Sequence, residues 1–180
     1  MSVLPSSVAL QDVDIWFQDE TRIGQQGSIT RVWHYTGQRP RAIRQQQFIS
    51  GYIFGAVCPS NGKAVGLVLP NTNKHAMKMH MEEISQHVPK GRHAIVVMDG
   101  AKWHQPDLNQ HNATMLTLPP YSLELNPIEQ VWQYIKQKWL SNRCFKDFDS
   151  IVQAASDAWN NMRQQTDILK TITHRAWAKV

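Results

Sequence analysis

Cysteine is scarce in this chain, and long apolar runs are missing. Cys58 and Cys144 are the only cysteines among 180 residues, and their spacing matches no metal or redox motif, so we expect two free thiols. No window approaches the roughly 20 apolar residues that a membrane span needs. The first residues carry neither a basic lead nor a long apolar stretch, which argues against a signal peptide. These absences predict a cytoplasmic protein without membrane contact.

Acidic residues are also missing from a long stretch, since none occurs between Thr21 and Met81, although the net charge of the whole chain is only +5. Basic and aromatic residues gather inside this stretch. They are Arg31, Trp33, Arg39, Arg41 and Arg44. A solvated face explains such a cluster as well as a polyanionic partner does. If the partner is DNA, the arginines would contact phosphates and Trp33 could stack on a base, although core burial is the more common fate of a tryptophan.

The hydrophobic pattern predicts alternating strands and helices, and therefore a single α/β domain. Strands are expected at residues 13–17, 31–35, 48–57, 64–69, 93–98 and 114–118, and helices at 73–88, 103–110, 126–140 and 148–162. An Asn-Gly turn joins the segments 48–57 and 64–69 into a hairpin. The strands at 13–17 and 93–98 should be parallel neighbours if the connection is right-handed. We expect helices on both faces of this sheet.

Three acidic residues stand where the predicted elements would bring them together. Asp19 follows the first strand, Asp99 ends the strand at residues 93–98, and Glu129 lies in the first turn of the helix at 126–140. The ends of two neighbouring strands lie about 4.8 Å apart, at the sheet edge where open α/β sheets usually bind ligands. Carboxylates held so close repel each other unless a cation lies between them. Hard oxygen ligands favour Mg²⁺ or Mn²⁺, and two such ions can support phosphodiester cleavage.

Each acid also has a purely structural explanation. Asp19 could close a strand or a turn, and Asp99 begins an Asp-Gly pair that is common in turns. Glu129 follows the predicted N-cap Asn126 by three residues, where it could complete a capping box. Neighbouring acids with the same option as Asp19 are Asp12, Asp14 and Glu20. Spacing alone does not decide between structure and function.

Two further polar residues follow Asp99 closely. Lys102 could pair with the scissile DNA strand. His104 could contact a phosphate or assist proton transfer, and a neutral histidine at a helix start is the alternative. Both are therefore included as candidate DNA contacts.

Three sequence segments carry a resemblance to a known family. They are WFQDETRI at residues 16–23, VVMDGAKWH at 96–104 and LPPYSLELNPIEQVWQYIK at 118–136. In this order they resemble the signature segments of DDE transposases from the bacterial insertion-sequence branch of the mariner superfamily. The third segment is the most specific, because its Asn-Pro-Ile-Glu run leads into an aromatic-bearing helix. The resemblance covers most of the chain.

The resemblance implies a ribonuclease-H-like fold with a mixed five-stranded sheet, and two divalent metal ions, Mg²⁺ or Mn²⁺, bound by Asp19, Asp99 and Glu129. It implies cleavage of double-stranded DNA at transposon ends and strand transfer of the freed 3′-hydroxyl into target DNA. It also implies a homodimer on DNA, associated with the nucleoid of a bacterial cell. Another ribonuclease-H-like nuclease or resolvase, and a catalytically inactive DNA-binding remnant, are the alternatives.

Two features depart from the family pattern. Leu123 stands where relatives carry a proline, which could loosen the loop without removing a ligand. Relatives also carry an N-terminal helix-turn-helix region, whereas the first catalytic strand of this sequence begins close to Met1. We therefore expect residues 1–180 to form the catalytic domain alone, as a split reading-frame product, a truncated copy or an excised fragment. Its DNA binding should depend on phosphates and salt rather than on base sequence.

Overall fold

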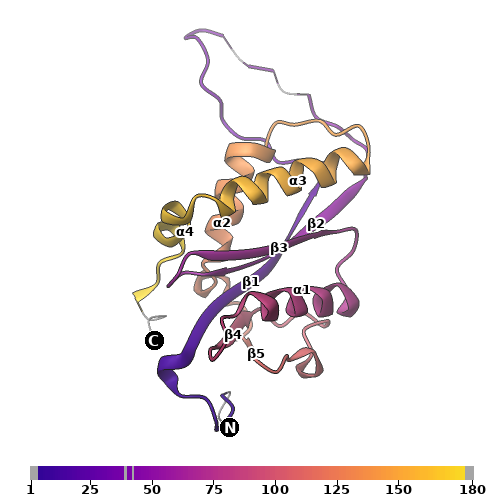
Figure 1. Cartoon of the computed structure of the whole chain (residues 1–180). Helices are drawn as coiled ribbons and strands as arrows, with labels where there is room; N and C mark the ends of the chain where they lie inside the picture. Colours follow the sequence, from indigo (N-terminus) through magenta and orange to yellow (C-terminus); the bar gives the residue numbers. More distant parts are fainter. Residues whose placement is uncertain (1–3, 39, 42, 177–180) are drawn as a thin grey trace.

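A five-stranded mixed sheet forms the centre of the molecule (Figure 1). The computed structural model describes residues 4–38, 40–41 and 43–176. The strands are β1 (Val13–Gly24), β2 (Ser50–Cys58), β3 (Lys63–Leu69), β4 (His93–Met98) and β5 (Ala113–Thr117). Their order in the sheet is β3-β2-β1-β4-β5, in which β1, β2 and β3 are antiparallel and β4 and β5 run parallel to β1. The predicted hairpin and the predicted parallel pairing of the first strand with residues 93–98 are both confirmed.

Helices cover both faces of this sheet, as predicted. They are α1 (Lys74–His87), α2 (Ile128–Ile135), α3 (Phe148–Arg163) and α4 (Thr166–Thr173). In Figure 1, α1 lies against one face, while α2 and α3 lie on the other. The helix of α2 continues as one π-helical turn, Lys136–Leu140, so this helical segment ends where the sequence predicts. Within the described part of the chain, no helix is long and apolar enough to span a bilayer.

Alternation along β1 divides the buried side chains into two cores. Phe17 packs with α2 and α3, whereas its neighbour Trp16 packs with α1, and both side chains are fully buried. The strand β4 is buried along its whole length, because helices cover both of its faces. The central sheet is therefore a rigid support for any side chain that projects from its ends.

Local side-chain caps fix the starts of two helices. Asn73 accepts a hydrogen bond from the backbone N–H of Ala76 at 2.9 Å and so caps α1. Asp147 and Ser150 form a reciprocal capping box at the start of α3. Because these bonds satisfy backbone donors at the helix ends, each helix begins at a defined residue.

Residues 25–49, which we call the arm, differ most from the sequence prediction. The strand expected at residues 31–35 is absent, because this segment leaves the sheet and finds no neighbouring strand to pair with. In Figure 1 the arm extends beyond α3 as a long loop. Similarly, the helix expected at 103–110 is reduced to a short 3-10 turn, Pro106–Leu108, where the proline removes a backbone donor.

Amide side chains hold the base of the arm against the segment between α2 and α3. Gln45 donates from Nε2 to the carbonyl oxygen of Phe145 at 2.8 Å and accepts from its N–H at 2.6 Å. Gln25 donates to the same carbonyl at 2.9 Å. Asn142 bonds both the N–H and the carbonyl oxygen of Thr30 at 3.1 Å. The arm therefore projects from an ordered base.

Gly55 allows two tryptophans to lie directly on the sheet. A Cβ atom at this position would lie 2.5 Å from Trp132 and 2.6 Å from Trp159. We expect Gly55→Ala to lower the free energy of unfolding by about 1–3 kcal/mol, because the added methyl overpacks this contact. Urea denaturation followed by tryptophan fluorescence measures the effect, and an unchanged midpoint would contradict this packing argument.

Candidate active site

Asp19 and Asp99 occupy equivalent positions on two adjacent parallel strands. Phe17 of β1 pairs with Val97 of β4, and each acid lies two residues beyond its member of this pair. Since side chains alternate along a strand, Asp19 is on the same side of β1 as Phe17, and Asp99 continues the side of Val97. Both Phe17 and Val97 belong to the core beneath α2 and α3. Asp19 lies within β1, which continues to Gly24, so the prediction that Asp19 follows the first strand is wrong. Both aspartates lie just beyond the residues that pair β1 with β4, on the α2 side of the sheet.

The start of α2 is fastened to the strand beside Asp19. Asn126 donates from Nδ2 to the carbonyl oxygen of Gln18 at 2.9 Å and accepts from the N–H of Ile128 at 3.3 Å. The helix begins at Ile128 with Pro127 as its N-cap, so the N-cap lies one residue after the predicted one, Asn126. Asn126 therefore sets the distance between β1 and the first turn of α2, which carries Glu129.

Trp132 connects α2 directly to Asp19. Its indole Nε1 donates to Oδ2 of Asp19 at 2.8 Å. Trp132 follows Glu129 by three residues, so both side chains lie on one side of the helix. Its ring also packs on Trp159 of α3, with ring centroids 5.5 Å apart. These contacts place the Glu129 turn of α2 over the carboxylate of Asp19.

The surroundings of Asp19 disfavour its negative charge. Burial raises the pKa of Asp19 to about 7, and the hydrogen bond from Trp132 only partly offsets this effect. The negative charges of Glu129 and Glu20 raise the pKa of Asp19 further. Asp19 is therefore close enough to Glu129 and Glu20 for their negative charges to disfavour its own, which is a situation that a bound cation relieves.

His104 holds the other aspartate. Its Nδ1 lies 3.0 Å from Oδ1 of Asp99, and its Nε2 lies 3.3 Å from Oε1 of Glu20. Burial by itself lowers the pKa of His104, but the hydrogen bonds to Asp99 and Glu20 outweigh it and raise the pKa to about 10. The hydrogen bond from His104 in turn lowers the pKa of Asp99. Asp99 remains accessible, because 42% of its side chain is exposed.

The contacts of each acid show whether it has a structural role. Asp14 forms a two-pronged ion pair with Arg92, with Nε and Nη2 each 2.8 Å from a carboxylate oxygen, so it is a structural residue. Glu129 does not form the capping box that its spacing allows, since α2 begins without a side-chain cap. Asp99 does accept from the N–H of Ala101 at 3.0 Å, so its turn role and a ligand role coexist.

The three predicted carboxylates do not close around a single point in this structure. Within residues 4–38, 40–41 and 43–176, no three Asp, Glu, His or Cys side chains are arranged to hold a metal ion. Asp19 accepts a hydrogen bond from Trp132, and the charge of Glu129 raises its pKa. Asp99, by contrast, bonds to His104. The structure places the acids on adjoining elements, and their joint metal binding stays a prediction.

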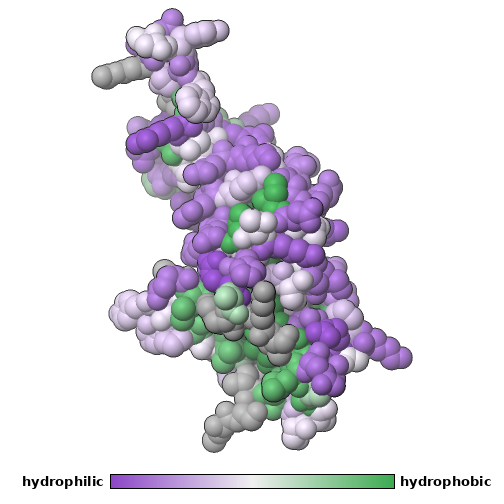
Figure 2. Space-filling model, turned by 90° about the vertical axis from the view of Figure 1, so that its left-hand side faces the viewer, coloured by the Kyte–Doolittle hydropathy of each residue, from purple (hydrophilic) through white to green (hydrophobic). Residues whose placement is uncertain are grey.

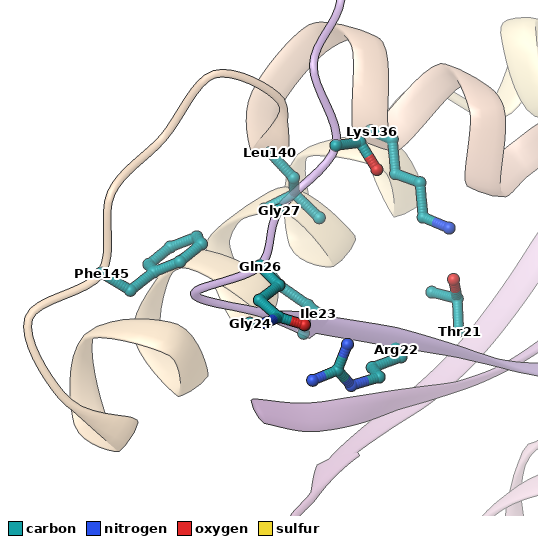
Figure 3. A pocket seen from close by; sticks show the side chains of 10 residues that line it. Thr21, Arg22, Ile23, Gly24, Gln26, Gly27, Lys136, Leu140 and Phe145 are labelled. Carbon is teal, nitrogen blue, oxygen red and sulfur yellow. The ribbon is translucent and has the colours of Figure 1, made fainter. Parts of the chain in front are cut away.

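A pocket beside the end of β1 is too small for a nucleotide. It measures about 70 Å³ and lies between the end of β1 and the π-helical turn after α2, where the amino group of Lys136 points toward Thr21 (Figure 3). A second hollow, of about 640 Å³, is open and lies where Val32 and Ile43 of the arm face Cys144. An extended substrate on the surface suits this arrangement better than an enclosed small molecule.

The predicted DNA contacts divide into exposed and buried residues. The arm stands out from the body as a narrow projection with a mainly hydrophilic surface (Figure 2). Trp33 is 104% exposed, so the alternative of core burial is wrong for this tryptophan. Arg31, Arg41, Arg44 and Lys102 are exposed as well, while Arg39 lies outside the described residues. By contrast, the side chain of His104 is only 1% exposed, so a phosphate could reach it only after the ring had moved.

The sequence does not predict the roles of two residues at the site, Trp132 and Glu20. The spacing predicts Trp132 as a core residue, and only the structure shows that its N–H reaches Asp19. Glu20 reads as a turn acid, yet it bonds His104 and Trp103, each at 3.3 Å. The available signal was the presence of a donor-bearing indole three residues after Glu129, on the same helix face.

Known proteins resemble this chain in sequence and in structure. The sequence matches the family described as DDE superfamily endonuclease over residues 14–152. The uncharacterized protein y4pE/y4sA of Sinorhizobium fredii (strain NBRC 101917 / NGR234) is 49% identical over 129 residues, which cover 71% of this chain and 96% of that protein. The mariner Mos1 paired end complex with Mg is similar in structure, with a TM-score of 0.67 and 15% identity over 89% of this chain and 51% of that one. The catalytic core domain of BIV integrase has a TM-score of 0.52 and 14% identity, with 84% of each chain covered.

These similarities differ in what they establish. At 15% and 14% identity, the two solved structures establish the fold, which is the predicted ribonuclease-H-like one. The chain spans about half the length of the Mos1 chain. The match over residues 14–152 includes Asp19, Asp99 and Glu129. The chain therefore belongs to the DDE superfamily endonuclease family.

Proposed function

We propose that this chain is the catalytic domain of a DDE transposase of the bacterial insertion-sequence type. It cleaves DNA at transposon ends and joins the freed 3′-hydroxyl to target DNA. The observation that carries this proposal is the position of Asp19 and Asp99, each two residues beyond the paired residues Phe17 and Val97. Glu129 of α2 supports the proposal, since it lies close enough to Asp19 for its charge to raise the pKa of that residue.

Asp19, Asp99 and Glu129 would hold two divalent ions, Mg²⁺ or Mn²⁺. The donors fit such ions, since all three are hard oxygen ligands and Asp19 bears a charge that burial and Glu129 disfavour. Bound ions would activate the attacking oxygen and stabilise the leaving oxygen of the phosphodiester. Trp132 keeps the carboxylate of Asp19 in place through its 2.8 Å hydrogen bond. Asn126 fixes the helix start, so that Glu129 stays next to β1.

DNA is the proposed partner, and a second copy of the chain would complete the assembly on it. The exposed arginines of the arm supply positive charge for phosphates, and the exposed ring of Trp33 offers a surface on which a base could stack. Lys102 is exposed in the loop after Asp99, and we propose that it contacts the strand being cut. We propose Arg39 as a further contact on its sequence position alone.

A cleavage and joining assay tests the proposed function. The purified chain is incubated with Mg²⁺ or Mn²⁺, an oligonucleotide that carries the transposon end, and a supercoiled target plasmid. We expect metal-dependent cleavage and joined products, and the loss of both in Asp99→Ala. Unchanged metal binding and cleavage in Asp99→Ala would reject the assigned roles.

The same assay separates the alternative functions. Cleavage of branched or hybrid substrates without joining would indicate a ribonuclease-H-like nuclease or resolvase. DNA binding that persists when all three acids are replaced, with no cleavage under either metal, would indicate an inactive remnant. Each outcome uses the same purified chain, so a single set of substrates distinguishes them.

The arm arginines provide a prediction about salt dependence. Replacing Arg31, Arg41 and Arg44 together by alanine should weaken DNA binding at any sequence, because phosphate contacts carry no sequence information. Each lost phosphate contact reduces the slope of log K against log salt by about 0.9. The triple variant should therefore lose up to about 2.7 of that slope in fluorescence anisotropy titrations.

A matched control removes the same amount of charge elsewhere. Lys78, Lys90 and Arg163 are exposed and lie outside the arm. Replacing these three by alanine should leave the salt slope near that of the wild type. If both triple variants lose the slope equally, net charge rather than the arm governs binding.

A further inference from the structure

Glu20 and His104 form a buried pair on the far side of β1 from Asp19. Glu20 directly follows Asp19, so its side chain projects to the opposite face of the strand. The side chains of Glu20 and His104 are 8% and 1% exposed. Neither ligand binding nor DNA contact explains such a buried pair. Its contacts lead instead to Asp99.

His104 contacts Asp99 at two points through a single ring nitrogen. Nδ1 lies 2.9 Å from the backbone carbonyl oxygen of Asp99 and 3.0 Å from its Oδ1. Both partners are acceptors, so Nδ1 carries the hydrogen and donates it. The N–H of Ala101 donates to the same Oδ1 at 3.0 Å. Oδ1 of Asp99 is therefore fixed by two donors.

Glu20 in turn fixes the His104 ring. Its Oε1 lies 3.3 Å from Nε2 of His104 and 3.3 Å from Nε1 of Trp103. Because Glu20 belongs to the central strand β1, the ring is tied to the most rigid part of the fold. The chain of contacts runs from β1 through Glu20 and His104 to Asp99, which lies in the loop after β4.

We propose that His104, oriented by Glu20, is a positioning residue that holds the Asp99 carboxylate ready for a divalent cation. This inference rests on the proposed function, because it assumes that Asp99 is a ligand. Asp99 lies beyond the last hydrogen-bonded residue of β4, where the sheet no longer restrains it. Groups that orient a ligand in this way typically contribute about 10–100-fold to metal affinity or activity.

Two substitutions of His104 separate its two hydrogen bonds. In His104→Asn, the amide nitrogen takes the place of Nδ1 and keeps the donor to Asp99. In His104→Gln, the amide nitrogen takes the place of Nε2, so it reaches Glu20 but not Asp99. Binding of Mn²⁺ to the full chain, measured by calorimetry, should weaken about 10–100-fold in His104→Gln. It should stay within about threefold of wild type in His104→Asn, since the bond to the ligand survives.

Enzyme kinetics give a second test, because a purely structural role of His104 would not lower the turnover number alone. In His104→Gln the turnover number should fall while the KM for DNA stays unchanged, and added Mn²⁺ should restore part of the rate. His111→Asn serves as the control, because His111 is exposed and lies outside this pair. If His104→Gln does not fold, Glu20→Ala carries the same test, because it removes the group that orients the ring.

The possible failures are distinguishable. If the wild type binds Mn²⁺ and cuts DNA, and His104→Gln or Glu20→Ala does both equally well, the positioning role is overturned while the proposed function stands. If the wild type neither binds Mn²⁺ nor cuts DNA, the proposed function fails and the positioning role fails with it. Weaker binding in His104→Asn than in His104→Gln would also overturn the assignment to Nδ1.

Discussion

Asp19→Asn is expected to abolish DNA cleavage and, at the same time, to make the metal-free protein more stable at pH 8. Asparagine retains an acceptor for the indole of Trp132 but removes a buried negative charge near Glu129 and Glu20. Loss of a metal-binding carboxylate should lower the cleavage rate at least about a thousandfold, as expected when charge stabilisation in the transition state is lost. Activity and stability should thus move in opposite directions.

The pH dependence of this gain follows from the pKa of Asp19. The folded protein raises this pKa from 3.8 to about 7, so it binds a proton more tightly than the unfolded chain does. The stability that this proton contributes is complete below about pH 4 and is lost as the pH rises through about 7. Asp19→Asn should therefore match the wild type at pH 4 and exceed it above pH 7, by on the order of 2–4 kcal/mol.

Thermal melting in EDTA measures this difference, and the same melts with Mg²⁺ provide the control. Binding to the folded state alone stabilises a protein by RT ln(1 + [L]/Kd). Mg²⁺ should therefore raise the melting temperature of the wild type and leave that of Asp19→Asn nearly unchanged. A variant that melts below the wild type at pH 8 in EDTA would show that Asp19 is not a destabilising charge.

Much of the fold follows from the hydrophobic pattern. The continuous apolar run of β4 indicates a strand covered on both faces, and the alternation of β1 places Phe17 and Asp19 on one side. The arm could not be predicted in this way. Residues 31–35 have the composition of a short strand, but a strand requires a partner, and pairing between distant segments is not visible in local sequence.

The sequence predicts which elements carry the three acids, but not the hydrogen bonds that orient their side chains. The parallel pairing of two strands and the first turn of a helix were enough to assign Asp19, Asp99 and Glu129 to neighbouring elements, although Asp19 lies inside β1 and not after its end. These hydrogen bonds depend on the direction in which the polar group at the end of a side chain points. The periodicity of a helix assigns Trp132 to the buried face and says nothing about its N–H, and Glu20 gains its partner His104 only through the turn after β4.

Each aspartate has its own donor, which is Trp132 on α2 for Asp19 and His104, further along the same loop, for Asp99. Carboxylates with fixed orientation lose less freedom when a cation binds, so the two donors preorganise the acids. Since Trp132 comes from the same helix face as Glu129, one rigid element both supplies a ligand and orients another.

Trp132→Phe should therefore slow DNA cleavage about 10–100-fold although it removes no ligand. Phenylalanine keeps an aromatic ring against Trp159 but has no N–H to donate to Asp19. Leaving this largely buried carboxylate without its donor should cost about 1.5–3 kcal/mol of folding free energy near neutral pH. Because the Trp132 bond lowers the pKa of Asp19, its loss should raise that pKa above about 7.

A proton on Asp19 competes with the metal, so the rise of the cleavage rate with pH should move to more alkaline pH in Trp132→Phe. The measurement is the cleavage rate at fixed Mn²⁺, followed from about pH 6 to about pH 9. Trp139→Phe is the matched control, because Trp139 lies further along the same helical segment and packs on Tyr134 rather than on an acid. If both variants have the wild-type profile, the indole of Trp132 acts only as packing, and the orientation of Asp19 must come from the backbone of β1.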